Sequence, residues 1–486
     1  MIWLYRVGMF FPLSWASFNT PIWYFYPTLY STVAGLCTAT GVHLGMMAPP
    51  VRGAPFLDAI LVSRVVGAAA SLGTLGLVGC LGTRAFGPAT GLLAAAFFAV
   101  VPVDVLQVHF ASVDPMLTLW MTATLVASYG VARSGSWARV VLAGVAAGLA
   151  TATKFTGAAG LAVVAWSIVE SALPRRAWGR ACGQLLVAVA ITVVTAVIAC
   201  TACVLQREGY LREMARLQSL ISQGGGLNSS LTTTLGWYGR PYLYQLVVGL
   251  PFALGLSLSV VAAAGIAVAA LRRTVTDRLL AVAIVPYFAI VGGYGAIYPR
   301  YLMPLVPPLV LLAARALVGA GSRPRVRTAV AGVVVIHTLV FSASMVARFA
   351  YDQQVDVARW VAAHAATTGN SPRIRIPDPW AGYSGLLEPL AREHLKAEPA
   401  PWGHWLEQSP DVFLLPEWAA IYVRRTPVPA GAAELEALEA GVAGYEEARR
   451  WAPSWFLHED VYGWLDPGLR TEWYGRTGVR VYVRAQ

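Results

Sequence analysis

Between residues 57 and 350, one apolar segment follows another with only short polar loops between them. A helix needs about 20 mostly apolar residues to cross a bilayer, and tilt accommodates somewhat shorter ones. Helices are the default spanning structure, because a bilayer cannot satisfy the polar backbone of irregular chain. The stretch therefore predicts about ten transmembrane helices, at 57–82, 87–103, 116–132, 138–152, 156–172, 183–205, 241–270, 279–297, 302–318 and 327–350.

Composition supports a polytopic membrane protein. Hydrophobic residues make up 57% of the 486-residue chain and charged residues only 13%, against roughly 25% charged in an average soluble domain. We expect three parts: an outer-face loop with an interfacial or re-entrant helix in 1–56, a transmembrane domain in 57–350, and an extracytoplasmic domain in 351–486. The fold class is an all-α membrane domain followed by a small C-terminal α/β domain.

Arginines fall in every second loop of the membrane part, which the positive-inside rule places in the cytoplasm. The opposite, outer face then receives the loop before residue 115, the turn at Lys154, the turn before residue 301 and the whole tail. This pattern explains the net charge of +11 without nucleic-acid binding. We expect a multi-pass protein of a prokaryotic plasma membrane. The arginines are Arg84, Arg133, Arg139, Arg175, Arg176, Arg180, Arg272, Arg273, Arg278, Arg323, Arg325 and Arg327.

The tail alternates predicted helices, at 355–366 and 434–448, with strand-like runs at 373–376, 412–415 and 479–483. All five cysteines lie outside it, in or beside apolar segments. Cys200 and Cys203 form a lone Cys-x-x-Cys pair, which is weak evidence for a metal or redox site, and small buried helix residues are the preferred interpretation. No disulfide framework is predicted.

Asp114 stands between two apolar segments in a region where acids are almost absent. An ionisable group at a membrane boundary is costly and is treated as a functional-site hypothesis. The alternative is an aspartate that caps the helix beginning at Pro115, because Asp favours the N-cap and Pro the first helical position. The two interpretations are compatible.

Two cations are predicted on the same face. Lys154 is one of only two lysines, against 34 arginines, and offers a point charge for a phosphate. A snorkelling lysine at a helix end is the alternative. Arg300, followed by Tyr301, precedes an apolar helix and can hold a phosphate through two parallel hydrogen bonds. Anchoring in the aromatic belt at the membrane interface is the alternative for the tyrosine.

A divalent metal is a weaker hypothesis. His109 lies five residues before Asp114, and the two side chains facing one cavity would offer two ligands. A lone histidine that is simply hydrogen-bonded is the more common case. Asp104 is the other nearby acid, and its position near a helix end predicts a solvated boundary residue. No certain cofactor follows from these residues.

Together, a carboxylate and two cations on one membrane face fit an enzyme that uses a lipid-linked phosphate donor. The cations would stabilise the phosphate leaving group, while the carboxylate accepts a proton or orients the acceptor. A transporter or lipid flippase is the main alternative, although the polar groups gather on one face rather than at midplane.

Six motifs in this order resemble the GT-C integral-membrane glycosyltransferases, and more narrowly the protein O-mannosyltransferase and ArnT-like group, family 39 and its relatives. They cover about residues 18–350. The motifs are Phe25-Tyr-Pro-Thr-Leu-Tyr30, Arg64 in a Gly/Ala-rich helix, Gly82-Thr-Arg-Ala-Phe-Gly87, Ser112-Val-Asp-Pro115, Ala152-Thr-Lys-Phe-Thr-Gly157 and Pro299-Arg-Tyr-Leu-Met-Pro304.

The resemblance implies about a dozen helices, an outward-facing active site, a polyprenyl-phosphate sugar donor and inverting transfer to a protein, lipid or glycan acceptor. Asp114 matches the family's second acidic position. The motifs of Lys154 and Arg300 match positions associated with the donor phosphate, and Tyr26 with Pro27 matches a segment that lines the same cavity.

One departure accompanies the resemblance. The group carries an acidic motif in the first outer loop, upstream of the Tyr-Pro segment, which is the expected general base. This sequence has no acid before Asp58. Our hypothesis is that the sequence starts within that loop and that the first helix and the principal base lie upstream of Met1. If the chain is complete as given, the expectation is weak or absent transfer, as in a non-catalytic or degenerate relative.

Overall fold

The computed structural model describes residues 29–47, 57–200, 207–212, 215, 240–294, 299–319, 324–350, 353–368, 372–377, 386–401, 404–407, 409–425, 429–451 and 478–485. The chain divides into two compact units. One comprises Met1–Gly225 with Gln245–Ser342, and the other comprises Gly226–Tyr244 with Ala343–Gln486.

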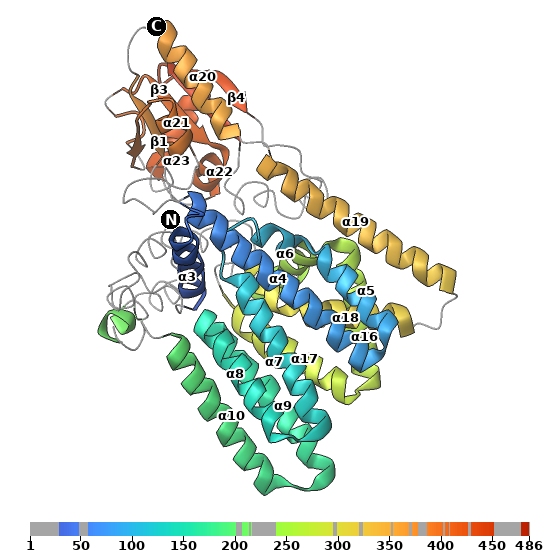
Figure 1. Ribbon diagram of the computed structural model, residues 1–486. Coiled ribbons are helices and arrows are strands. Elements are labelled where there is room, and N and C mark those ends of the chain that lie inside the picture. The colour runs from blue at the N-terminus through green and yellow to red at the C-terminus, as the bar shows by residue number, and fades with distance from the viewer. Residues whose placement is uncertain are drawn as a thin grey trace. The chain divides into compact units, whose positions relative to one another are not determined.

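The first unit is helical (Figure 1). Its elements include short 3₁₀ turns η1 (Phe155–Ala159), η2 (Leu173–Arg175) and η4 (Pro299–Leu305), and one π-helical turn, η3 (Gln245–Gly249). The α-helices of this unit are α3 (Leu29–His43), α4 (Leu57–Phe86), α5 (Pro88–Ala99), α6 (Pro102–Gln107), α7 (Asp114–Ser134), α8 (Trp137–Thr153), α9 (Gly160–Ala172), α10 (Trp178–Ala199), α15 (Leu250–Leu254), α16 (Leu256–Arg272), α17 (Val275–Val291) and α18 (Val306–Gly319). Helix α19 (Pro324–Ala350) begins in the first unit and continues into the second, and α14 (Pro241–Tyr244) belongs to the second unit.

Among the described residues, six helices are long and apolar enough to cross a membrane, and a seventh span results if one bent pair is counted. Helices α5, α8 and α17, with 12, 17 and 17 residues, account for most of the difference from the predicted ten. Large apolar side chains face outward where lipid would lie, for example Leu186 and Ile198 of α10, which are 73% and 70% exposed. The protein is an integral membrane protein.

The segment predicted as one apolar stretch over 241–270 is broken. Pro241–Leu254 and Leu256–Arg272 meet at a bend of 117°. Gly255 between them has φ +82°, a conformation that side-chain-bearing residues rarely adopt. A hydropathy pattern does not report such a change of direction, because both arms are equally apolar.

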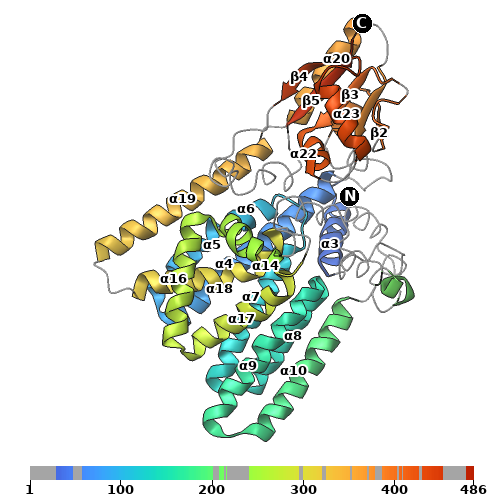
Figure 2. The ribbon, with the colours of Figure 1, turned by 180° about the vertical axis from the view of Figure 1, so that it is seen from behind.

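Helices α7 and α8 form an antiparallel hairpin, which Figure 2 shows from behind. Gly135 ends α7 in the left-handed conformation, with φ +62°, and its carbonyl oxygen accepts hydrogen bonds from Arg180 and Gln184 at 2.8 and 2.9 Å. The turn is short, so the N-terminal end of α7 lies beside the C-terminal end of α8. This geometry brings Asp114 and Lys154, 40 residues apart in sequence, to one end of the bundle.

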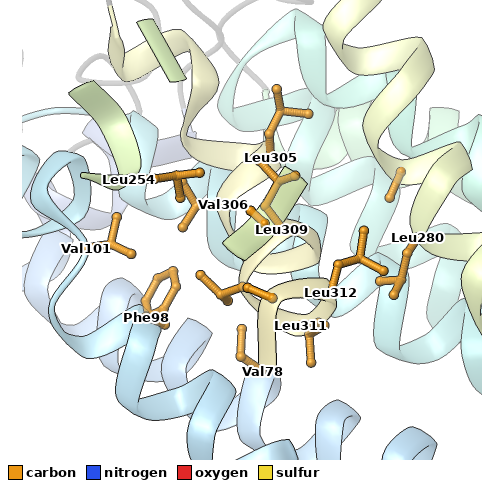
Figure 3. Packing of buried hydrophobic residues seen from close by; sticks show 14 of the residues in the cluster. Val78, Phe98, Val101, Leu254, Leu280, Leu305, Val306, Leu309, Leu311 and Leu312 are labelled. Atoms are coloured by element: carbon orange, nitrogen blue, oxygen red, sulfur yellow. The ribbon is translucent and has the colours of Figure 1, made fainter. Parts of the chain in front are cut away.

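Helix α18 lies at the centre of the hydrophobic core, and the span Pro299–Gly319 is 78% buried. Its leucines and valines contact side chains from α4, α5, α15 and α17 (Figure 3). Close helix crossings depend on glycine: a Cβ on Gly265 of α16 would lie 2.4 Å from the carbonyl oxygen of Leu312. The helix that follows η4 is therefore held rigidly, which fixes the position of Arg300 and Tyr301.

Two ion pairs stabilise the end of the bundle opposite Asp114. Arg278 of α17 makes a bidentate contact with Glu170 of α9, with nitrogen–oxygen distances of 2.6 and 2.7 Å. Arg315 of α18 pairs with Asp277, which also forms a capping box with Thr274 at the start of α17. Glu170 and Asp277 are therefore acids of the membrane part whose partners are structural arginines.

Cys200 follows α10 and is disulfide-bonded. Its interpretation as a plain buried helix residue was therefore wrong, whereas Cys37, Cys80 and Cys182 are free. The disulfide lies at the end of α10 far from Arg180.

The second unit contains a five-stranded mixed sheet of order β2-β1-β3-β5-β4, from β1 (Ile374–Pro377), β2 (Ala397–Ala400), β3 (Val412–Pro416), β4 (Tyr445–Trp451) and β5 (Val479–Arg484). β3 is parallel to β1 and antiparallel to β5. Successive β3 side chains enter two cores, one shared with α20 (Gln353–Thr368) and α21 (Leu387–Arg392), the other with α22 (Glu417–Arg425) and α23 (Pro429–Glu439).

The strands and the helix predicted near 355–366 are found, but the helix predicted at 434–448 is wrong in its second half. Residues from Tyr445 onward form β4, which pairs with β5. Their Glu- and Arg-rich composition favours a helix locally, and the pairing with β5 outweighs that preference. The tryptophans at 455, 464 and 473 lie outside the described residues.

Candidate functional site

A buried ion pair joins the α7–α8 hairpin at its open end. The Lys154 Nζ lies 2.8 Å from Asp114 Oδ1, and the two side chains are 7% and 3% exposed. Neither charge tolerates such burial alone, because removing an ion from water costs several kcal/mol unless a partner compensates. The structure thus brings together the acid and the lysine that the sequence singled out.

Ser112 completes the first turn around the carboxylate. Its Oγ donates to Asp114 Oδ2 at 2.9 Å and accepts from the Asp114 backbone N–H at 3.3 Å. Asp114 is the first residue of α7 and its side chain bonds Lys154, so its role is not that of a simple cap. Sequence reasoning did not single out Ser112 itself, although it is part of the quoted motif and its position two residues before an aspartate is a recognisable turn signal.

The second cation and two tyrosines come from the other half of the unit. The ring of Tyr301 in η4 lies 4.4 Å from Lys154 Nζ and 5.7 Å from the guanidinium carbon of Arg300, measured to the ring centroid. Tyr294 packs edge-on against that ring at 5.8 Å. One aromatic ring therefore contacts both cations, and cation–π attraction favours their positive charge there. The sequence analysis did not identify Tyr294.

The backbone around Lys154 depends on a close approach. Lys154 is extended, with φ −157°, between the end of α8 and the turn η1. A Cβ on Gly157 in η1 would lie 2.3 Å from the carbonyl carbon of Ala150 and 2.7 Å from the Thr151 nitrogen. Both are backbone atoms, so the turn has to move to accommodate any side chain.

Gly157→Ala is therefore expected to lower stability by about 1–3 kcal/mol, the usual range for overpacking. Gly76→Ala is the matched control, because nothing lies within 4 Å of that position. Thermal unfolding in detergent should show a lower midpoint for Gly157→Ala alone. Equal midpoints for the two variants would contradict the close packing of η1 on α8.

Of the remaining predicted site residues, the structure describes His109. The Nδ1 of His109 lies 2.7 Å from the Val105 carbonyl oxygen, four residues earlier. Within the described residues, no group of three or more His, Cys, Asp or Glu side chains is arranged to hold a metal ion. Tyr26 and Pro27 lie outside the described residues.

Asp104 is buried, and its prediction as a solvated boundary residue was wrong. It is 6% exposed and accepts a hydrogen bond from Ser71, and its Oδ1 has no hydrogen-bond partner among the described residues. Burial raises the pKa of this carboxyl to about 7, although the bond from Ser71 opposes the shift. The helix end at which it lies packs under η4 and α15 instead of meeting water.

Parts of this chain are similar to known proteins. Residues 56–199 match the family model for dolichyl-phosphate-mannose-protein mannosyltransferase, a range that includes Asp114 and Lys154 but not Arg300 or Tyr301. No curated protein matches the sequence.

Two crystal structures of ArnT from Cupriavidus metallidurans are similar to this chain. The structure bound to undecaprenyl phosphate has 15% sequence identity and a TM-score of 0.51 over 75% of this chain and 66% of that chain. The apo structure has 14% identity and a TM-score of 0.51 over 99% of this chain and 92% of that chain. At these identities the similarity establishes the fold.

Proposed function

We propose that this protein, which has the GT-C glycosyltransferase fold and is related to the ArnT and protein mannosyltransferase group, transfers a sugar from a polyprenyl-phosphate donor to an acceptor on the extracytoplasmic face. The acceptor is a nucleophilic group of a protein, lipid or glycan. In the reaction, the bond between the sugar C1 and the phosphate oxygen breaks and polyprenyl phosphate leaves with the electron pair. The acceptor forms the new bond to C1 and releases its proton.

The observation that carries this proposal is the cluster of Asp114, Lys154, Arg300 and Tyr301 at one membrane-boundary end of the unit. A leaving phosphate gains negative charge as the sugar departs, and fixed cations stabilise such charge most strongly where water is excluded. Lys154 is buried and immobilised, and Arg300 contacts the same ring. The structure of ArnT with undecaprenyl phosphate supports a lipid phosphate as the ligand class.

Asp114 is proposed to act mainly by positioning Lys154. Both oxygens of its carboxylate are already engaged, because Oδ1 lies 2.8 Å from the Lys154 Nζ and Oδ2 accepts from the Ser112 hydroxyl at 2.9 Å. The contact with Oδ1 holds the Lys154 ammonium in place beside the Tyr301 ring. The ion pair is thus a preformed half-site for phosphate.

Two independent features support an outer location. The arginine-rich loops lie at the other ends of the helices that carry Asp114 and Lys154, as the positive-inside rule requires of cytoplasmic loops. The disulfide of Cys200 follows α10, which runs in the same direction as α8, and so indicates an oxidising compartment at the same end.

The proposal is tested by transfer of labelled sugar in membranes that express the complete open reading frame. Synthetic phosphopolyprenols that carry mannose or another sugar serve as alternative donors, and product is separated from donor by extraction. We expect labelled product dependent on this protein with at least one donor. Movement of donor across the bilayer without labelled product would instead favour a flippase. If neither labelled product nor donor movement is observed, the result favours a non-catalytic relative.

A further inference from the structure

A groove large enough for a lipid chain has its charged end far from the proposed catalytic cluster. An apolar groove of about 650 Å³ runs along α7 between α4 and α8, both of which pack on α7. This volume lies within the roughly 300–1,000 Å³ range of small-molecule sites. Its floor consists of small residues of α7, including Ala123, Ala127 and Gly130, and its walls of Leu77, Leu142 and Leu149.

The groove is positively charged at one end only. Arg84, Arg133 and Arg139 line it there, and none of its lining residues in the described part of the chain is acidic. Arg139 donates to the Gly130 carbonyl oxygen at 2.9 Å and to Ser134 Oγ at 3.3 Å, which holds it against the C-terminal end of α7. For the side chains of Arg84 and Arg133, no hydrogen bond or ion pair is found within the described part of the chain.

The charged end lies far from Asp114. Nineteen residues separate Asp114 from Arg133 on α7, which is about 28 Å along a helix and close to the roughly 30 Å hydrocarbon thickness of a bilayer. Trp120 lines the groove 13 residues before Arg133, so the groove extends about 20 Å from its arginines. That length exceeds one leaflet of hydrocarbon and accommodates an extended acyl chain.

We infer that this groove binds one anionic phospholipid of the cytoplasmic leaflet. Its phosphate lies among Arg84, Arg133 and Arg139, and one acyl chain lies along Ala123, Ala127 and the facing leucines. Charge complementarity selects the anionic headgroup, because three arginines and no acid meet it. A zwitterionic lipid fits the same apolar walls but brings its own cation to the arginines. The inference does not depend on the proposed transfer reaction, because the arginines of the groove and the Asp114 cluster lie at opposite ends of α7.

The test is native mass spectrometry of detergent-purified full-length protein with added phosphatidylglycerol or phosphatidylcholine. We expect one phosphatidylglycerol to be retained with an affinity about 10- to 30-fold above that of phosphatidylcholine, as expected for charge contacts at a membrane surface. Arg84→Gln with Arg133→Gln should remove this preference. Arg325→Gln with Arg327→Gln, which removes the same charge from the start of α19, should leave it intact.

A second variant separates the groove from charge alone. Ala123→Leu fills the apolar floor without touching the arginines, so it should weaken the binding of both lipids while leaving the unfolding midpoint in lipid-free detergent near that of the wild type. Equal loss of preference in the two double-arginine variants would overturn the inference, since it would show a general effect of charge. Unchanged binding in Ala123→Leu would overturn it as well.

Discussion

Lys154→Ala is expected to reduce sugar transfer about 100- to 1,000-fold, the usual cost of removing one preorganised donor to a developing negative charge. The physical reason is the burial of the ammonium beside Asp114 and over the Tyr301 ring. Water enters poorly there and cannot replace the missing charge. The measurement is the rate of labelled product formation in membranes that contain equal amounts of the two proteins.

The chain provides its own control, because Lys396 is the only other lysine and is exposed on the second unit. Lys396→Ala should transfer sugar at the wild-type rate. Lys154→Arg should recover only part of the loss, because a planar guanidinium does not reproduce a compact ammonium in a tight site. Transfer that persists unchanged in Lys154→Ala would refute the site assignment while leaving the fold in place.

Asp114→Ala is expected to lower the free energy of unfolding by about 3–5 kcal/mol, the range for a buried ion pair that loses one partner. The cost arises because Lys154 remains at a position that is 6% exposed, without its carboxylate. The double variant Asp114→Ala with Lys154→Met should regain much of this loss, because no buried charge is then left without its partner. Unfolding in mixed detergent micelles measures the wild type, Asp114→Ala, Lys154→Met and the double variant on one scale.

The double-mutant cycle distinguishes a structural ion pair from two separate surface charges. Losses that simply add in the double variant would show that the two residues do not interact energetically. The same double variant should be inactive in the transfer assay even where its stability is restored. Stability and activity therefore separate: the pair is replaceable for folding, and its lysine is not replaceable for phosphate binding.

The grouping of the candidate residues could be predicted from the sequence because the membrane simplifies the problem. Hydropathy predicted most of the segments of the first unit, and the parity of the arginine loops placed Asp114, Lys154 and Arg300 on one face. In the structure, Lys154 pairs with Asp114, and both Lys154 and Arg300 lie over the Tyr301 ring. Burial was less predictable: Asp104 was expected at the solvent boundary and lies within the protein.

Alternation of apolar segments and charged loops was sufficient to predict the membrane fold class and to group the candidate residues at one end of the helices, because both depend on the one-dimensional order of residues along the chain. Tertiary structure alone decided that Asp114 pairs with Lys154, that the chain bends at Gly255, and that residues from Tyr445 form a strand. Each of these depends on segments distant in sequence, whose contacts exist only once the helices and strands have packed.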